Sequence, residues 1–153
     1  MSAHIPAPLL WEITRGHSAY TVKRRSGGGA EFSRDPLNLT NKHSRIHEGY
    51  INDKAIGIVP NEKGGFTLYT KTSSKSHQPA KSTHKTVFGP STSSRKSYRS
   101  ILNSTGNRGY RPDLSKAAVK RASAIKASQR PVKPDPPTKL RGAKARKAAA
   151  ASA

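Results

Sequence analysis

The sequence predicts an α+β protein: a small N-terminal β-sheet domain followed by helices, with an extended basic loop and a basic C-terminal tail. Short runs in which apolar and polar residues alternate occur up to Tyr69, as expected of half-buried strands. Beyond that residue large apolar side chains become scarce, and alanine recurs at helical spacing. The charge is also uneven, because residues 1–62 hold 8 Lys and Arg against 6 Asp and Glu, whereas residues 63–153 hold 21 against 2.

Five runs in the first part of the chain predict strands. Residues 9–14 and 19–23 are close enough in sequence to form a hairpin, and residues 30–33 predict a third short strand. Residues 55–59 and 66–70 predict two further strands, joined by a turn that contains two adjacent glycines. Alternation within these runs predicts a core made of Leu9, Trp11, Ile13, Tyr20, Val22, Phe32, Ile56, Ile58, Phe66 and Leu68.

The second part of the chain predicts helices. Residues 91–104 predict a helix with Ser91 as its cap. Residues 112–129 predict the strongest helix, because Pro112 suits a first turn and alanine is abundant. Its apolar face is narrow and consists mainly of small residues, which predicts close packing against another surface: Leu114, Ala117, Ala118, Ala122 and Ile125.

The predicted organisation has four parts. Residues 1–70 form a mostly β platform domain, 71–90 an extended basic loop, 91–130 a helical RNA-binding region, and 131–153 a disordered or extended basic tail. A net charge of +19 over residues 63–153 (21 − 2), together with few large apolar residues, opposes compaction of the second half. We therefore expect that half to become ordered against a polyanion.

Several functional classes are excluded by composition. The chain has no Cys, which excludes disulfides and zinc sites built on Cys clusters. His43 and His47 have the spacing of two metal ligands on a helix, but Gly49 and their polar neighbours disfavour a helix there, so we expect no metal. No set of residues has catalytic spacing, which predicts neither an enzyme nor a cofactor nor a small-molecule substrate. No apolar stretch is long enough to predict a secretion signal or a contact with membrane.

The basic residues predict a nucleic-acid partner. They are interleaved with Gly, Ser and Thr, and no motif that reads DNA is visible, so structured RNA is favoured over DNA. Tyr98 and Tyr110 stand beside Arg99 and Arg111, a pattern that fits either stacking on bases or packing in the core. The candidate RNA-binding residues are Lys23, Arg24, Arg25, Lys42, His43, Arg45, Arg95, Lys96, Arg99, Arg108, Arg111, Lys116, Lys120, Arg121 and Lys126.

Several motifs carry a resemblance to a known family. They are Leu10-Trp11-Glu12-Ile13, Phe32-Ser33, the stretch 38–44, and above all Tyr110-Arg111-Pro112-Asp113-Leu114 followed by Ala117-Ala118 and 121–125. In this order, over residues 9–132, the chain resembles the eukaryote-specific ribosomal protein family twenty-eight of the large subunit. The resemblance implies strands followed by helices, and a non-catalytic constituent of the cytoplasmic large ribosomal subunit, assembled through the nucleolus. The implied partners are large-subunit rRNA and neighbouring large-subunit ribosomal proteins.

Two alternatives stay open. Residues 68–72 and 77–81 also look like the Mak16-like family of nucleolar assembly factors, which shares the N-terminal module. Members of that family carry cysteines around the loop equivalent to 41–47 and acidic stretches further on, and this chain has neither. The Lys-, Ala- and Pro-rich end also resembles a linker-histone tail, which would make the protein a component of chromatin.

Overall fold

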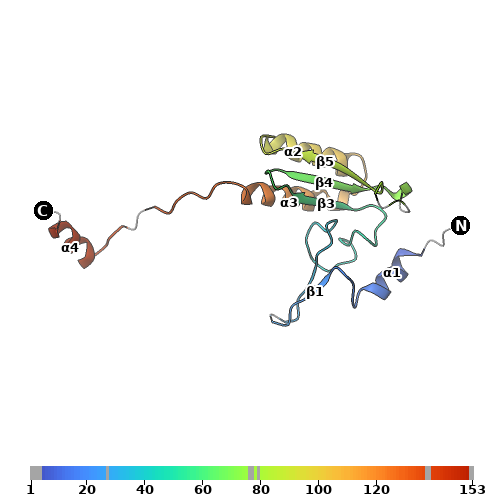
Figure 1. Cartoon of the computed structure of the whole chain (residues 1–153), viewed down its shortest axis with the longest axis horizontal. Coiled ribbons are helices and arrows are strands. Elements are labelled where there is room, and N and C mark those ends of the chain that lie inside the picture. Colours follow the sequence, from blue (N-terminus) through green and yellow to red (C-terminus); the bar gives the residue numbers. More distant parts are fainter. Residues whose placement is uncertain (1–4, 27, 76–77, 79, 137–138, 152–153) are drawn as a thin grey trace.

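The computed structural model describes residues 5–26, 28–75, 78, 80–136 and 139–151, and it confirms the α+β class (Figure 1). A three-stranded antiparallel sheet runs in chain order through β3 (Ile56–Pro60), β4 (Phe66–Lys71) and β5 (Thr83–Phe88). A separate hairpin pairs β1 (Thr21–Lys23) with β2 (Glu31–Ser33). The helices are α1 (Ala7–Thr14), α2 (Ser94–Leu102), α3 (Ser115–Ser128) and α4 (Ala143–Ala151), with short helical turns η1 (Ser73–Lys75), η2 (Asn103–Asn107) and η3 (Pro112–Leu114).

The turn between β3 and β4 requires its glycines. Gly64 and Gly65 have φ values of +84° and +80°, in the left-handed region that side chains disfavour. Gly65 also lies so close to β5 that an added Cβ would be 2.1 Å from the carbonyl oxygen of Phe88. This close approach allows the Phe66 and Phe88 rings to stack with their centroids 4.9 Å apart.

One face of the sheet forms the core together with α2 and α3. The strands contribute Ile56, Ile58, Phe66, Leu68 and Phe88, all on the same side according to the strand register. From α2 comes Ile101, and from α3 come Ala118, Ala122 and Ile125. Leu114, the last residue of η3, joins them just before α3 begins. The predicted core residues of β3 and β4, and the predicted apolar face of the 112–129 helix, are therefore confirmed.

The partner of that helix face is the protein's own sheet. Ala118 and Ala122 are fully buried, and their small side chains let α3 approach β3 closely. Residues 83–128 thus contribute to a core that packs the chain against itself, which gives this region a source of order other than the polyanion that the sequence led us to expect. The charge is accommodated because the cations of α2 and α3 lie mainly on the outer faces of the helices.

The N-terminal strand prediction is wrong. Residues 9–14 lie in the helix α1, and Pro8 occupies its first turn, where a missing N–H costs nothing. Leu9 and Ile13 are 52% and 68% exposed, so neither belongs to the core. Trp11 is half-buried.

The hairpin partner of residues 19–23 is also corrected, because β1 pairs with β2 rather than with residues 9–14. Within this hairpin Val22 is half-buried, whereas Tyr20 and Phe32 are 38% and 41% exposed. The two-stranded ribbon is too small to bury both of its faces.

Three further predictions need correction in the second half. The extended loop expected over 71–90 contains the edge strand β5, whose side chains are mostly polar and of which only Phe88 is buried. Ser93 and not Ser91 caps α2, since its hydroxyl accepts from the backbone N–H of Lys96. In the predicted tail, residues 131–136 are exposed and extended, but 143–151 form α4; residues 76, 77, 79, 137, 138, 152 and 153 lie outside the described part.

The segment between β2 and β3 is held mainly by buried polar groups. The carboxylate of Asp35 accepts from the backbone N–H groups of Leu37, Gly49 and Tyr50 at 2.9, 2.8 and 3.2 Å. The Lys71 ammonium, at the end of β4, donates to the carbonyl oxygens of Gly49 and Asn52 at 3.0 and 2.9 Å. Burial lowers the pKa of Lys71. These bonds attach the N-terminal segment to the sheet.

Gly65→Ala is expected to destabilise the fold by about 3 kcal/mol or more, because it adds a clash with backbone to the strain of a positive φ. Gly109→Ala is the matched control, since Gly109 also has a positive φ, of +62°, but has open space around it. The control is expected to cost only about 1 kcal/mol. Urea unfolding followed by circular dichroism compares the two, and equal losses would contradict the close β4–β5 approach.

Candidate nucleic-acid interface

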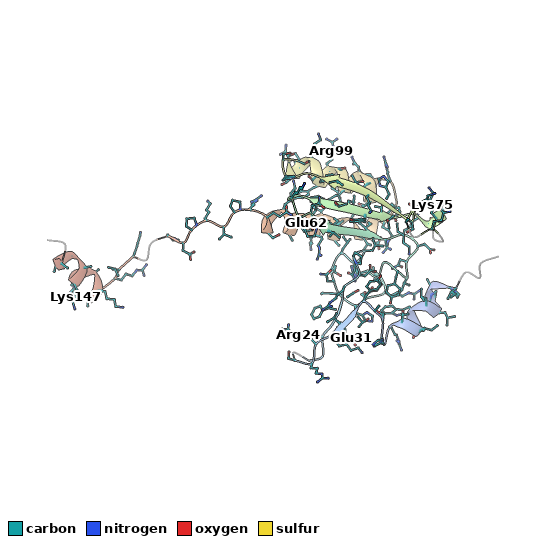
Figure 2. The ribbon with its side chains drawn as sticks, viewed as in Figure 1. Arg24, Glu31, Glu62, Lys75, Arg99 and Lys147 are labelled. Atoms are coloured by element: carbon teal, nitrogen blue, oxygen red, sulfur yellow. The ribbon has the colours of Figure 1, made fainter. Side chains whose placement is uncertain are left out.

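A groove of 810 Å³ lies between the sheet and the α2–η2 segment. Leu68 and Thr70 of β4 and His84 and Thr86 of β5 contribute one side. The other side comes from α2, η2 and the turn after it: Lys96, Arg99, Ser100, Asn103, Ser104, Arg108, Gly109 and Tyr110, with Lys54 at the end of the groove. In Figure 2 Arg99 lies at the outer edge of α2, away from the sheet.

The groove is strongly cationic. Four Lys and Arg side chains and one His line it, and none of its lining residues is Asp or Glu. Within the described part of the chain, the side chains of Lys96, Arg99 and Arg108 have neither an ion-pair nor a hydrogen-bond partner. Their charges are therefore available to an anion, and the walls focus the potential within the groove.

Helical spacing explains how α2 presents these cations. Ser97 and Ile101 lie four residues apart and are fully buried against the core. Lys96, Arg99 and Asn103 follow one another at spacings of three and four, so they form a row along one edge of the helix. The predicted residues Lys96, Arg99 and Arg108 thus share one site, while the equally exposed Arg95 is not among the residues that line it.

The groove also contains residues that sequence reasoning missed. Lys54 and His84 each stand alone in the sequence, 30 residues apart, and only the sheet places them in one groove. Thr70 and Thr86 come from neighbouring strands and face the same side. These residues could have been found only by predicting that residues 83–88 form a strand. That strand places His84 and Thr86 on the face covered by α2.

The predicted cations of the β1–β2 hairpin lie elsewhere on the molecule. Lys23 forms an ion pair of 2.9 Å with Glu31, and this hydrogen bond lowers the pKa of Glu31. Arg24 and Arg25 are exposed in the loop, where Figure 2 shows Arg24 at the tip. Lys42, next to the hairpin, and Arg45 are exposed as well.

The predicted cations of α3 divide into two groups. Lys116 and Lys120 are exposed. Arg121 is half-buried, and once the Asn41 amide is oriented to suit its neighbours, its oxygen accepts from the guanidinium of Arg121 at 3.3 Å. The Lys126 ammonium donates to the carbonyl oxygen of Thr92. Arg121 and Lys126 therefore have partners within the protein.

Arg111 connects three segments of the chain. Its guanidinium donates to the carbonyl oxygens of Lys54 and Ile46 at 2.8 and 3.1 Å. It also forms a bidentate ion pair with Asp113, with N–O distances of 2.9 and 2.7 Å, and this contact lowers the pKa of Asp113. The Arg111 side chain is only 17% exposed. Its bonds make it a structural clamp and leave it little capacity for phosphate.

His43 is almost completely covered. Its side chain is 8% exposed, its ring lies 5.0 Å from that of Trp11, and Nε2 is 2.8 Å from the carbonyl oxygen of Arg15. Nδ1 is 3.5 Å from a carboxylate oxygen of Glu48, and the other oxygen of Glu48 accepts from the Ser33 hydroxyl at 3.0 Å. Burial raises the pKa of Glu48. His43 is thus placed to support the fold, away from an external ligand.

No metal centre is found around these histidines. Burial, followed by the charge of Arg111, lowers the pKa of His47. Over residues 5–26, 28–75, 78, 80–136 and 139–151, no three His, Asp or Glu side chains gather closely enough to hold a metal ion. None of the helices in those ranges has the length and apolar character to cross a membrane.

The two tyrosines pack against the core. Tyr98 is partly buried against it. The Tyr110 hydroxyl accepts from the backbone N–H of Ala55 at 3.2 Å and donates to the carbonyl oxygen of Lys71, and burial raises its pKa. Of the two interpretations left open by the sequence, core packing is the one that this geometry supports.

A cationic groove on a small α+β protein is thus the main candidate site, and comparison with known proteins identifies the family. The model of the ribosomal L28e protein family matches residues 9–128. The chain therefore belongs to the ribosomal L28e protein family. It is also 45% identical over 126 residues to the large ribosomal subunit protein eL28 of Schizosaccharomyces pombe, a match that covers 82% of this chain and 93% of that protein.

Arg111→Ala is expected to lower the free energy of unfolding by about 2 kcal/mol, because two carbonyl groups and a carboxylate lose a charged donor. Arg108→Ala serves as the control, since the Arg108 side chain is exposed and has no partner in the described part of the chain, and its cost should stay within about 0.5 kcal/mol. Urea denaturation measures both. A loss as small for Arg111 as for Arg108 would show that the clamp is absent.

Glu48→Gln tests the buried carboxylate. Because the folded-state pKa of Glu48 lies above its ordinary value of 4.5, the folded protein keeps a proton that the unfolded chain releases. The stability of the native protein therefore falls as the pH rises from about 4.5 through the folded-state pKa. The free energy of unfolding of Glu48→Gln, taken relative to that of the native protein, should therefore rise over the same pH interval and stay constant below it. Urea unfolding between about pH 4 and pH 7 gives the difference, and one that does not change with pH would refute the raised pKa.

Proposed function

We propose that this protein is a structural, non-catalytic constituent of the cytoplasmic large ribosomal subunit, where it binds and stabilises large-subunit rRNA beside neighbouring ribosomal proteins. Membership of the L28e family supports this assignment, as does the relative that is named a large-subunit protein. The observation that carries the RNA contact is the set of groove cations Lys96, Arg99 and Arg108, whose side chains have no ion-pair or hydrogen-bond partner among the described residues. Such cations gain most from neutralising phosphates, because no internal bond has to be broken first.

The proposed contact has one main surface and several auxiliary ones. In the groove, Lys96, Arg99 and Arg108 extend from α2 and from the turn that follows η2, so the backbone positions of these three residues are fixed relative to one another. Phosphate contacts of this kind set the position of a protein on RNA, while the shape of the RNA provides the specificity. The hairpin tip around Arg24, the exposed face of α3 and the tail with α4 add further positive charge.

The triple variant Lys96→Ala/Arg99→Ala/Arg108→Ala is expected to weaken binding to large-subunit rRNA at least about tenfold and to reduce the log–log salt slope by about 2 to 3. The control removes the same charge from α4 through Lys144→Ala/Arg146→Ala/Lys147→Ala, and we expect it to change affinity less. Filter binding over a salt series gives both quantities. Larger losses for the α4 variant, or an unchanged slope for the groove variant, would contradict the proposed surface.

A second experiment separates the proposed function from its alternatives. A tagged chain should sediment with translating polysomes, and RNase but not DNase should release it. Confinement to nucleolar precursor particles would instead indicate an assembly factor. Release by DNase would indicate a chromatin protein.

A further inference from the structure

We infer that the groove binds an unpaired nucleotide of RNA, and not only the outer backbone of a duplex. This inference rests on the proposed rRNA binding and specifies the form of RNA that the site takes. It follows from three features of the groove: the neutral polar groups on its sheet side, its size and its rigidity.

The sheet side of the groove differs from its cationic edge. Thr70 and Thr86 lie on the same face of adjacent strands, and Ser100 lies opposite them on α2. Within the described chain none of these three hydroxyls has a hydrogen-bond partner. A hydroxyl can both donate and accept, so these groups can pair with the edges of bases and with the ribose 2′-hydroxyl, which also carry donors and acceptors.

An unpaired nucleotide fits these groups inside a concave site better than a duplex does. In an A-form duplex the Watson–Crick edges are used in pairing and the deep major groove is closed to side chains, so the duplex offers its 2′-hydroxyls and remaining base edges only on the wide, shallow minor-groove surface. A bulged or single-stranded nucleotide exposes its edges and its ribose. Its phosphates can then contact Lys96 and Arg99 while the base reaches the threonines.

The dimensions and composition of the groove agree with this ligand. A volume of 810 Å³ falls within the range of pockets that hold one small molecule. His84 is exposed beside Thr86 and offers an imidazole ring against which a base can stack. Lys54 adds a further cation, and its ammonium lies 5.7 Å from the centre of the Tyr110 ring.

The groove is also rigid before any ligand arrives. Leu68 in its floor and Ile101 under α2 are both in the buried core, and Thr86 is paired with Leu68 in the sheet. The backbone positions of the threonines and of the α2 cations therefore keep their separation without RNA. Binding would cost little ordering entropy of the backbone, and only the exposed Lys and Arg side chains would lose rotamer freedom.

The experiment compares three RNA hairpins of equal length whose stems are closed by the same non-nucleotide linker, so that the linker adds no unpaired nucleotide. One has a fully paired stem, and the other two carry a bulge of three unpaired uridines or of three unpaired adenines. Fluorescence anisotropy with the full chain at constant salt gives the affinities. We expect at least one bulged hairpin to bind about fivefold or more tightly than the paired one. Thr70→Val/Thr86→Val should reduce this preference to about twofold or less, because valine keeps the shape and the strand preference but has no hydroxyl. The preference is the ratio of the affinities of one variant for the bulged and paired hairpins, so a general loss of affinity does not affect it.

Two further variants make the result specific. Thr83 lies on the same strand as Thr86 but on the opposite face of the sheet, so the variant Thr83→Val should keep the preference for the bulged hairpin. Ser100→Ala removes a hydroxyl from the helix side and should lower the preference even if the valine variant fails to fold.

Each remaining outcome is decisive. Equal affinity for paired and bulged hairpins would overturn the inference and leave the proposed rRNA binding intact. A preference that Thr70→Val/Thr86→Val and Ser100→Ala do not change would also overturn it, because the unpaired nucleotide would then bind elsewhere. Absence of binding to every hairpin and to rRNA would refute the proposed function itself.

Discussion

The narrow apolar face of α3 fits against the β3–β4 sheet because its central residues are Ala118 and Ala122. Close approach of the helix lets a small set of larger side chains, from Ile56 to Ile125, form a continuous core. Burial of these side chains opposes the mutual repulsion of the charges in a chain whose net charge is +21. It also fixes α2 beside the sheet, and the cationic groove exists only because these two elements are held apart at a constant separation.

The same packing separates the basic residues into two kinds. Lys71, Arg111 and Lys126 donate to backbone carbonyl groups of distant segments, so their charge contributes to the fold. The cations of the groove have no such partners in the described chain. Part of the positive charge therefore forms hydrogen bonds between distant segments of the chain. Another part is exposed on α2 and on the turn after η2, where it lines the groove. Net charge alone does not distinguish the two kinds.

Sequence patterns predicted the α+β class, the strands β3 and β4, and the buried face of α3, because in these elements periodicity and burial agree. They failed at α1, where Leu9, Trp11 and Ile13 also fit an alternating pattern and a run of eight residues cannot separate the two periods. They failed at β5, since an edge strand with one buried residue shows no apolar alternation. The groove residues Lys54 and His84 could not be predicted, because only tertiary pairing brings them together, and the inward roles of Arg111 and His43 depend on carbonyl groups far away in the chain.

The central claim is that the core, without RNA, orders residues 83–128 and thereby the groove. Amide hydrogen exchange of the RNA-free protein tests it most directly, because it reports the opening of each element separately. We expect the amides of β4 and of α3 to exchange slowest and at a common rate set by global unfolding. Those of residues 139–151 should exchange at nearly the rate of an unfolded chain, because α4 is a helix of 9 residues that buries none of them and so opens easily. Exchange in α3 as fast as in that tail would contradict the account.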